Sequence, residues 1–395
     1  MAGQLNAAAT PFCEIVEAQG HLIDSHIMER IFDAVVEFGG RFEVEQFSIG
    51  RTNSDPSSLR LRVEADSKHD MERLMTQLLE LGCAPEDFYS TTNQRTLVRH
   101  RGQWLEVRNQ RMDAMIVVRE SSAQCVRLRD IEAGDPVVVG MKGIRIVPEA
   151  KERDRLSFAF MNNEISSERQ VETAVTQTAE MMQQVRAVGK KIVAVAGPVV
   201  VHTGGCGPLS WLIRNHWIDT LLAGNALAVH DIESALLGTS LGVRTKDGRL
   251  EQHGHRNHMR AINAIYRAGG IPQAVESGVL QTGVIYECVK ARVPYVLAGS
   301  LRDDGPLPGV ITDMNEAQDA YAALLQNAGI VLCLSSMLHS IAVGNMLPAW
   351  VKIVCVDINP AVPTKVSDRG TGQATGVVTD VGLFLELLAK KLETQ

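Results

Sequence analysis

The strongest constraint in this sequence is an alternation of short apolar runs with helical segments over its second half. The apolar runs have the length and composition of buried strands, whereas the segments between them repeat their apolar residues with a helical period. We predict strands at 191–201, 226–229, 295–298, 330–334, 353–356 and 376–379, and helices at 167–187, 208–222, 257–268, 278–291, 316–327 and 381–392. Strands that alternate with helices indicate a parallel sheet covered on both faces.

The first half of the chain has a different pattern. A strand, a helix, two strands and a second helix follow one another at 12–18, 25–38, 41–49, 59–65 and 71–81, which is the order of a ferredoxin-like unit. From about residue 96 to 160, short β-prone runs are separated by many turn residues and predict a small β-subdomain. The expected fold class is α/β, with an N-terminal ferredoxin-like α/β module (1–95), a small β-subdomain (96–162) and a C-terminal parallel-sheet, Rossmann-like domain (163–395).

Composition argues against several classes of protein. The formal net charge of −7 argues against nucleic acid as a partner. The seven cysteines are scattered and form no CxxC pair, so we expect neither a disulfide framework nor a zinc knuckle. No run reaches the roughly 18 apolar residues of a membrane span. We therefore expect a cytoplasmic protein with no membrane partner.

The polar residues at the predicted strand ends are the candidate ligand site, because ligands of open parallel sheets bind beyond the carboxyl ends of the strands. These ends lie at 202–207, 225–233, 299–306, 335–339 and 356–360. The first, HTGGCG, is either a phosphate-binding turn or an ordinary tight turn, because it departs from the GxGxxG fingerprint. Asp357 follows a buried strand and is placed to accept the hydroxyl groups of a ribose, with an Asx-turn as the alternative.

Two further patterns concern metals and anions. His253-x-His255-x-x-His258 has the residue type of a metal site, but it lies in a loop without a ligand-spaced helix, so we predict no metal site. A cluster of five arginines is either a solvated sheet face or a clamp for an anion or carboxylate. They are Arg99, Arg101, Arg108, Arg111 and Arg119.

Several long runs resemble one known family. They include HTGGCGPLSWLIRNHWIDTLLAGNALAVHDIESALLGTSLGV, PYVLAGSLRDDGPLPGVITD, SSMLHSIAVGNMLPA and VCVDINPA, with GHLIDSHIMERIFDAVVEFGG near the N-terminus. They are similar to the NAD-dependent ornithine cyclodeaminases of the archaeal and arginine-dihydrolase-fused type, whose older label is lysine-ketoglutarate reductase/saccharopine dehydrogenase. The likeness spans nearly the entire chain. The sequence has no room for the dihydrolase domain of fused members, so we expect no arginine dihydrolysis.

The resemblance implies a particular cofactor domain. It implies that NAD binds a domain related to that of deoxyhypusine synthase, which would explain the missing GxGxxG. It also implies NAD contacts at several strand ends. The residues are Asn225, Ala226, Asp304, Ser336, Met337, Leu338, His339, Asp357, Asp380 and Val381.

The activity that the resemblance implies is the conversion of L-ornithine to L-proline and ammonia with NAD as a recycled cofactor. The substrate is then a small basic amino acid, and we expect a homo-oligomer. From residue type and position, we predict that Asp303 grips an amino group or acts as base, that His339 shuttles protons and that Arg302 pairs with the carboxylate.

Two other functions fit the same sequence. One is an NAD-dependent opine- or saccharopine-type amino-acid dehydrogenase, and the other is a non-catalytic sensor of NAD or an amino acid. The chain length of the substrate stays open between ornithine, lysine and diaminobutyrate.

Overall fold

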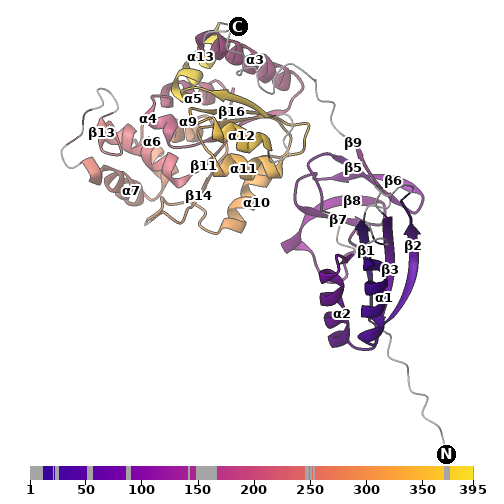
Figure 1. Ribbon diagram of the computed structural model, residues 1–395. Helices are drawn as coiled ribbons and strands as arrows, with labels where there is room; N and C mark the ends of the chain where they lie inside the picture. The colour runs from indigo at the N-terminus through magenta and orange to yellow at the C-terminus, as the bar shows by residue number, and fades with distance from the viewer. Residues whose placement is uncertain are drawn as a thin grey trace, which may run out of the picture. The chain divides into compact units, whose positions relative to one another are not determined.

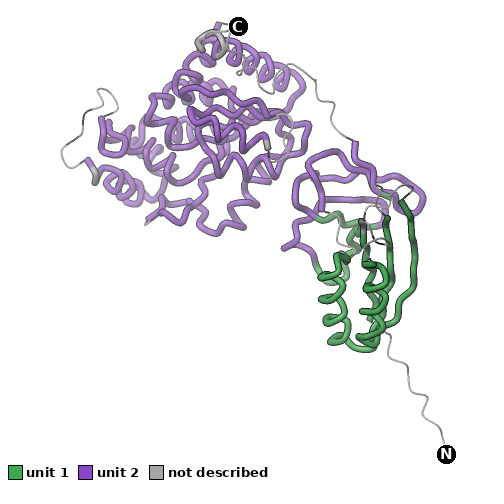
Figure 2. The backbone as a smooth tube through the Cα atoms, in the orientation of Figure 1, with its two compact units in different colours: residues 1–89, 115–119, 132–143 green, residues 90–114, 120–131, 144–395 purple. Residues whose placement is uncertain are grey.

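The computed structural model divides into two compact units (Figure 2). Unit 1 holds residues 1–89, 115–119 and 132–143, and unit 2 holds residues 90–114, 120–131 and 144–395. The structure describes residues 12–20, 22, 26–50, 57–85, 90–140, 143–147, 167–244, 249, 251, 254–303, 305–368 and 374–394.

Unit 1 contains the predicted ferredoxin-like module. Its elements are β1 (Phe12–Gly20), α1 (Ile27–Glu37), β2 (Arg41–Ser48), β3 (Ser57–Ala65), α2 (Lys68–Glu80) and β4 (Ala84–Pro85). The strands form an antiparallel sheet in the order β2-β3-β1-β4. Ile31 and Val35 of α1 and Leu74 and Leu78 of α2 pack in one core with Leu61 of β3. The α/β order predicted from the sequence is confirmed.

Unit 2 begins with short strands. They are β5 (Arg95–His100), β6 (Gln103–Arg108), β8 (Ser122–Arg127) and β9 (Ile144–Val147), with a 3-10 turn at Leu128–Asp130; β7 (Ala114–Arg119) starts at the boundary with unit 1. β5 pairs antiparallel with both β6 and β9, and β6 pairs in parallel with β8. These strands agree with the β-rich character predicted for this region, while the division of the chain into three domains stays a prediction.

A six-stranded parallel sheet is the centre of unit 2 (Figure 1). Its strands are β10 (Lys191–Ala196), β11 (Thr220–Gly224), β14 (Tyr295–Ala298), β15 (Ala328–Leu334), β16 (Lys352–Asp357) and β17 (Ala374–Val378). The spatial order is β14-β11-β10-β15-β16-β17, with every pairing parallel. In order of appearance this is 3-2-1-4-5-6, the order of a Rossmann sheet. The predicted α/β class is confirmed.

Helices cover both faces of this sheet, as a parallel sheet requires. The side chains of β10 alternate between two cores: Ile192 and Ala194 belong to one, and Val193 and Val195 to the other. The first core is completed by α3 (Ser167–Ala187), α5 (Cys206–Arg214), α6 (Asn225–Leu237), α7 (Asn257–Ala268), α8 (Ile271–Glu276), α9 (Val284–Lys290) and α13 (Val381–Glu393). The second is completed by α10 (Met314–Leu324), α11 (Leu338–Met346) and α12 (Ala361–Asp368). No helix among the described residues is long and apolar enough to cross a membrane.

Several segments predicted from the sequence differ in the structure. The strand predicted at 191–201 ends at Ala196, and residues 199–202 form the short helix α4 (Val199–His202). The helix predicted at 208–222 ends at Arg214, a strand occupies Thr220–Gly224, and the predicted strand 226–229 lies inside α6. The reason is burial: α6 buries residues around most of its circumference, so its sequence lacks the one-sided pattern of a surface helix.

Two acidic residues that were predicted to lie at a strand end lie in the core instead. Asp231 and Glu233 lie on α6 and are 1% and 0% exposed. Asp231 accepts hydrogen bonds from the backbone N–H groups of Val284 and Ile285, at 2.9 and 2.8 Å, and so holds the start of α9. Burial raises the pKa of Asp231 to about 6, although these two hydrogen bonds oppose the rise.

This pKa predicts a pH-dependent contribution to stability. The folded state holds the Asp231 proton more tightly than the unfolded state, so the contribution is complete below about pH 4 and is lost as the pH rises through 6. Asp231→Asn removes the titration. We expect the stability of the native protein relative to this variant to fall by about 3 kcal/mol over that range, measured by urea unfolding. A difference that stays constant with pH would contradict the assignment.

Candidate active site

A cavity of about 570 Å³ opens at the carboxyl ends of β14, β11, β10 and β15. The chain order reverses between β10 and β15, and such a switch point is where open α/β sheets bind ligands. The floor includes Gly197 after β10, Gly224 after β11 and Ser335 after β15. Gly197-Pro198 therefore follows β10 directly, whereas residues 203–205 of the glycine-rich segment lie between α4 and α5, and Cys206 begins α5.

Two glycines allow close packing at this floor. A Cβ atom on Gly197 would lie 2.0 Å from the carbonyl oxygen of Ser335, so no larger residue fits between β10 and β15 here. A Cβ atom on Gly224 would lie 2.8 Å from Cε1 of His339. Gly197 thus allows the ends of β10 and β15 to pack closely, and Gly224 leaves room for the His339 ring.

Two helices start at the cavity without a side-chain cap. The N-cap residues of α6 and α11 are Gly224 and Met337, and neither makes a side-chain capping hydrogen bond. By contrast, α10 and α13 are capped by Asp313 and Asp380, whose carboxylates accept from backbone N–H groups at 2.9 Å. The first amides of α6 and α11, together with the helix dipoles, suit a bound anion such as a pyrophosphate.

His339 lies in the cavity wall against Tyr321. The Tyr321 hydroxyl donates to the carbonyl oxygen of Ala223 at 2.7 Å and lies 3.4 Å from Nδ1 of His339, and the two rings meet edge to face. Burial lowers the pKa of His339, so its ring is neutral at neutral pH. A neutral imidazole can both accept and donate a proton, which is the property that a proton shuttle needs.

A second histidine in the cavity wall is backed by a buried carboxylate. Nδ1 of His230 lies 3.2 Å from the carboxylate of Glu233, which also accepts from the Thr239 hydroxyl at 2.8 Å and the Gly242 N–H at 3.1 Å. Burial alone would raise the pKa of Glu233, but these hydrogen bonds lower it, so the carboxylate stays charged. The ring of His202 lies 5.1 Å from that of His230. The Glu233 carboxylate therefore orients the His230 imidazole at the cavity.

Sequence reasoning missed this pair because it placed His230 and Glu233 at a strand end. Their i, i+3 spacing is the signal that would have joined them, once the segment is read as a helix. His258 of the HxHxxH pattern also lines the cavity, whereas His253 lies outside the described residues. Among the described residues, no group of three His, Cys, Asp or Glu side chains is arranged to hold a metal ion.

The structure brings most of the predicted site residues to one cavity. Those that line it are Asn225, Ala226, Arg302, Asp303, Ser336, Met337, Leu338 and His339. The carboxylate of Asp303 accepts from the Ser300 N–H at 2.7 Å, and Arg302 is exposed. The amide oxygen of Asn225 accepts from the Leu307 N–H at 3.1 Å and so holds the loop that carries Asp303.

The other predicted cofactor residues lie elsewhere or outside the described residues. Asp357 ends β16, next to β15, and accepts from the Asn359 N–H at 2.8 Å in an Asx-turn. Asp380 caps α13, and Val381 is 1% exposed. Asp304 falls outside the described residues. The NAD contacts at these four positions stay predictions.

Three family models match successive parts of the chain. "Arginine dihydrolase ArgZ-like, C-terminal, Rossmann fold" matches residues 176–388, and the model of the ArgZ-like C-terminal first region matches residues 95–175. The "LOR/SDH bifunctional enzyme conserved region" matches residues 13–84. Together the three models match residues in both units.

Individual proteins match most or nearly all of the chain. An ornithine cyclodeaminase of Methanocaldococcus jannaschii is 48% identical over 97% of this chain and 96% of its own length. The crystal structure of a conserved LOR/SDH protein from Methanococcus maripaludis matches with a TM-score of 0.72 and 48% identity, over 79% of this chain and 95% of that one. AgrE in ternary complex with ornithine and NAD⁺ matches with a TM-score of 0.56 and 46% identity, over 97% of this chain and 58% of that one.

Proposed function

The chain belongs to the ArgZ-like, LOR/SDH-related family, and we propose that it is an NAD-dependent ornithine cyclodeaminase that converts L-ornithine to L-proline and ammonia. The observation that carries the proposal is its likeness, over almost the full length of both chains, to a protein named ornithine cyclodeaminase. A related protein has been crystallised with both ornithine and NAD⁺.

The cavity at the switch point fits a dinucleotide. It combines a floor of glycines at positions 197 and 224 with the uncapped N-termini of α6 and α11, which can hold a pyrophosphate. Residues 225, 226 and 336–339 would contact NAD there, and Asp357, Asp380 and Val381 extend the predicted contacts along the same edge of the sheet. When bound there, NAD would supply reversible acceptance of a hydride from Cα of the substrate, so none would be consumed.

The remaining tasks fall to side chains of this chain. Ornithine must lose a proton from its α-ammonium group and expel ammonia, and its α-carboxylate must be held. Asp303 is our candidate for gripping an amino group or accepting its proton, and Arg302 for the carboxylate. Neutral His339 can move a proton between substrate and solvent. His230, held by Glu233, presents a second imidazole to the same cavity.

The direct test is a product balance. Purified protein is incubated with L-ornithine and catalytic NAD⁺, and proline, ammonia and NADH are followed together. We expect equal amounts of proline and ammonia, far exceeding the NAD present, with no accumulation of NADH. Asp303→Asn in the same assay should lose most turnover, and full turnover would dismiss its catalytic role.

Other outcomes would reassign the protein. Stoichiometric NADH with a keto acid would indicate an opine- or saccharopine-type dehydrogenase. NAD binding without turnover of ornithine, lysine or diaminobutyrate would indicate a sensor. The homo-oligomer and the cytoplasmic location stay predictions.

Gly224→Ala tests the cofactor cavity. The new methyl group would meet Cε1 of His339 at 2.8 Å and force the ring away from Tyr321. We expect NAD affinity, measured by calorimetry, to fall by about tenfold or more, equivalent to about 1.4 kcal/mol. Gly207→Ala is the matched control, because Gly207 lies on α5 with open space at its Cβ position. NAD affinity equal in both variants would place the cofactor elsewhere.

A further inference from the structure

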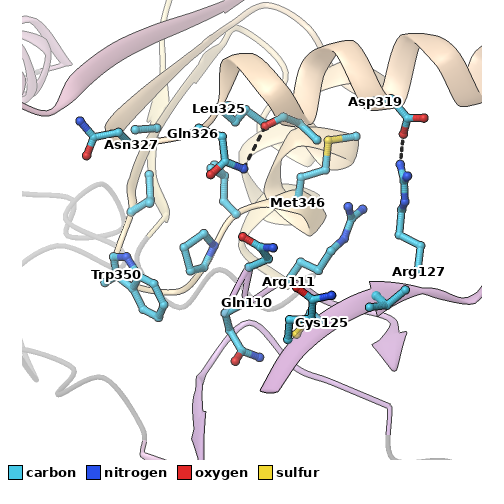
Figure 3. Close-up of a pocket in the computed structure, with 18 of the residues that line it drawn as sticks. Gln110, Arg111, Cys125, Arg127, Asp319, Leu325, Gln326, Asn327, Met346 and Trp350 are labelled. Carbon is cyan, nitrogen blue, oxygen red and sulfur yellow. Dashed lines mark hydrogen bonds and ion pairs between the residues drawn. The ribbon is translucent and has the colours of Figure 1, made fainter. Parts of the chain in front are cut away.

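A further cavity in unit 2, of about 530 Å³, lies where the short strands meet α10 and α11 (Figure 3). Arg127 pairs there with Asp319 and with Asp130, so these charges are neutralised within the protein. Of the five arginines clustered in the sequence, Arg111 lines this cavity and the other four are exposed. Among the described residues, no histidine lines it. The groups that can exchange protons near neutral pH gather instead in the cavity at the switch point.

Three histidines line the cavity at the switch point. They are His230 of α6, His258 of α7 and His339 of α11. Within the described part of the chain, His230 is the one of the three whose ring contacts a carboxylate, that of Glu233. The ring of His339 lies against the Tyr321 hydroxyl instead. His230 is therefore the imidazole that a negative charge supports from behind.

The Glu233 carboxylate is held in one orientation by donors other than His230. It accepts from the Thr239 hydroxyl at 2.8 Å and from the backbone N–H groups of Leu241 and Gly242 at 3.3 and 3.1 Å. Burial would raise the pKa of Glu233, but the hydrogen bonds from His230, Gly242 and Thr239 lower it, so the carboxylate is charged and can only accept. The proton between the two side chains therefore lies on Nδ1 of His230. Nε2 is left as the ring atom that gains and loses a proton.

A neighbouring histidine leaves room for positive charge on His230. The ring of His202 lies 5.1 Å from that of His230, and its Nδ1 lies 2.7 Å from the Ser240 hydroxyl. Burial and the nearby His230 lower the pKa of His202, so its ring is neutral at neutral pH. A neutral neighbour does not repel a proton on His230, and a carboxylate behind an imidazole stabilises its protonated form. His230 can thus carry an extra proton during a reaction step.

We propose that His230 is a catalytic residue that moves a proton from the incoming to the leaving nitrogen of ornithine, and that Glu233 is its positioning residue. The inference rests on the proposed function. Once Cα is oxidised to an iminium carbon, the distal amine, having lost its ammonium proton to solvent, forms a bond to Cα. The new ring nitrogen then carries two hydrogens and the positive charge.

The proton transfer completes the exchange of nitrogens. Nε2 of His230 accepts a proton from the ring nitrogen and donates it to the α-amino nitrogen. The bond between Cα and that nitrogen breaks, and its electron pair leaves with ammonia. The freed pair of the ring nitrogen forms the protonated cyclic imine, and His230 returns to its starting state. Because both nitrogens are bonded to Cα, one ring atom can reach each of them.

The test is a single turnover of L-ornithine with protein and NAD⁺ in excess. Ammonia release and the absorbance of reduced nicotinamide are followed together in the native protein, His230→Gln and Glu233→Gln. The matched controls are His69→Gln and Glu180→Gln, which change exposed side chains on α2 and α3. Circular dichroism and calorimetric binding of NAD⁺ check that each variant is folded. His230→Asn replaces the glutamine variant if that variant fails to fold.

We expect His230→Gln to release ammonia at least about a hundredfold more slowly than the native protein. Reduced nicotinamide should still form and should persist, because the oxidation precedes the step that needs His230. Glu233→Gln should show the same separation to a smaller extent, with NAD⁺ affinity unchanged, which a merely structural role would not produce. Both controls should match the native protein.

Two outcomes would overturn this inference alone: native ammonia release by His230→Gln, or an oxidation step in that variant that slows as much as ammonia release. A native protein that oxidises ornithine without releasing ammonia, or does not react with it, would contradict the proposed function and this inference with it.

Discussion

Parallel strands must be covered on both faces, and most of unit 2 follows from how this chain meets that requirement. The strand β15 is buried at all its positions, and β10 sends alternate side chains into two separate cores. Helices therefore occupy both faces, and the carboxyl edge between β10 and β15 is left to bind a ligand. There Gly197 and Ser335 pack closely against each other and form part of the cavity floor. The helices α6 and α11 begin beside it.

The same requirement places charge inside the protein. Because α6 is buried on most sides, its two carboxylates lie in the core and must be satisfied there. The Asp231 carboxylate accepts from the first backbone amides of α9. The Glu233 carboxylate accepts from the turn that follows α6 and also contacts the His230 ring. One helix thereby fixes the neighbouring segments and orients a histidine toward the cavity. The buried helix α6 therefore has both a structural and a chemical role.

Much of this could be predicted from the sequence, for a physical reason. The strands β14, β15 and β16 are apolar runs bounded by turn residues, so both their type and the polar residues at their ends could be located, including Asp303 and His339. The segment 220–233 was misassigned because a fully buried helix and a buried strand have the same apolar composition.

We propose that the same substrate carbon is oxidised and then reduced within one cavity by a retained NAD. Incubation of the protein with L-ornithine deuterated at Cα, in ordinary water and with catalytic unlabelled NAD⁺, tests it most directly. We expect proline that carries deuterium at Cα over many turnovers, observed by mass spectrometry. Proline without deuterium, or deuterium accumulating in reduced NAD, would contradict it.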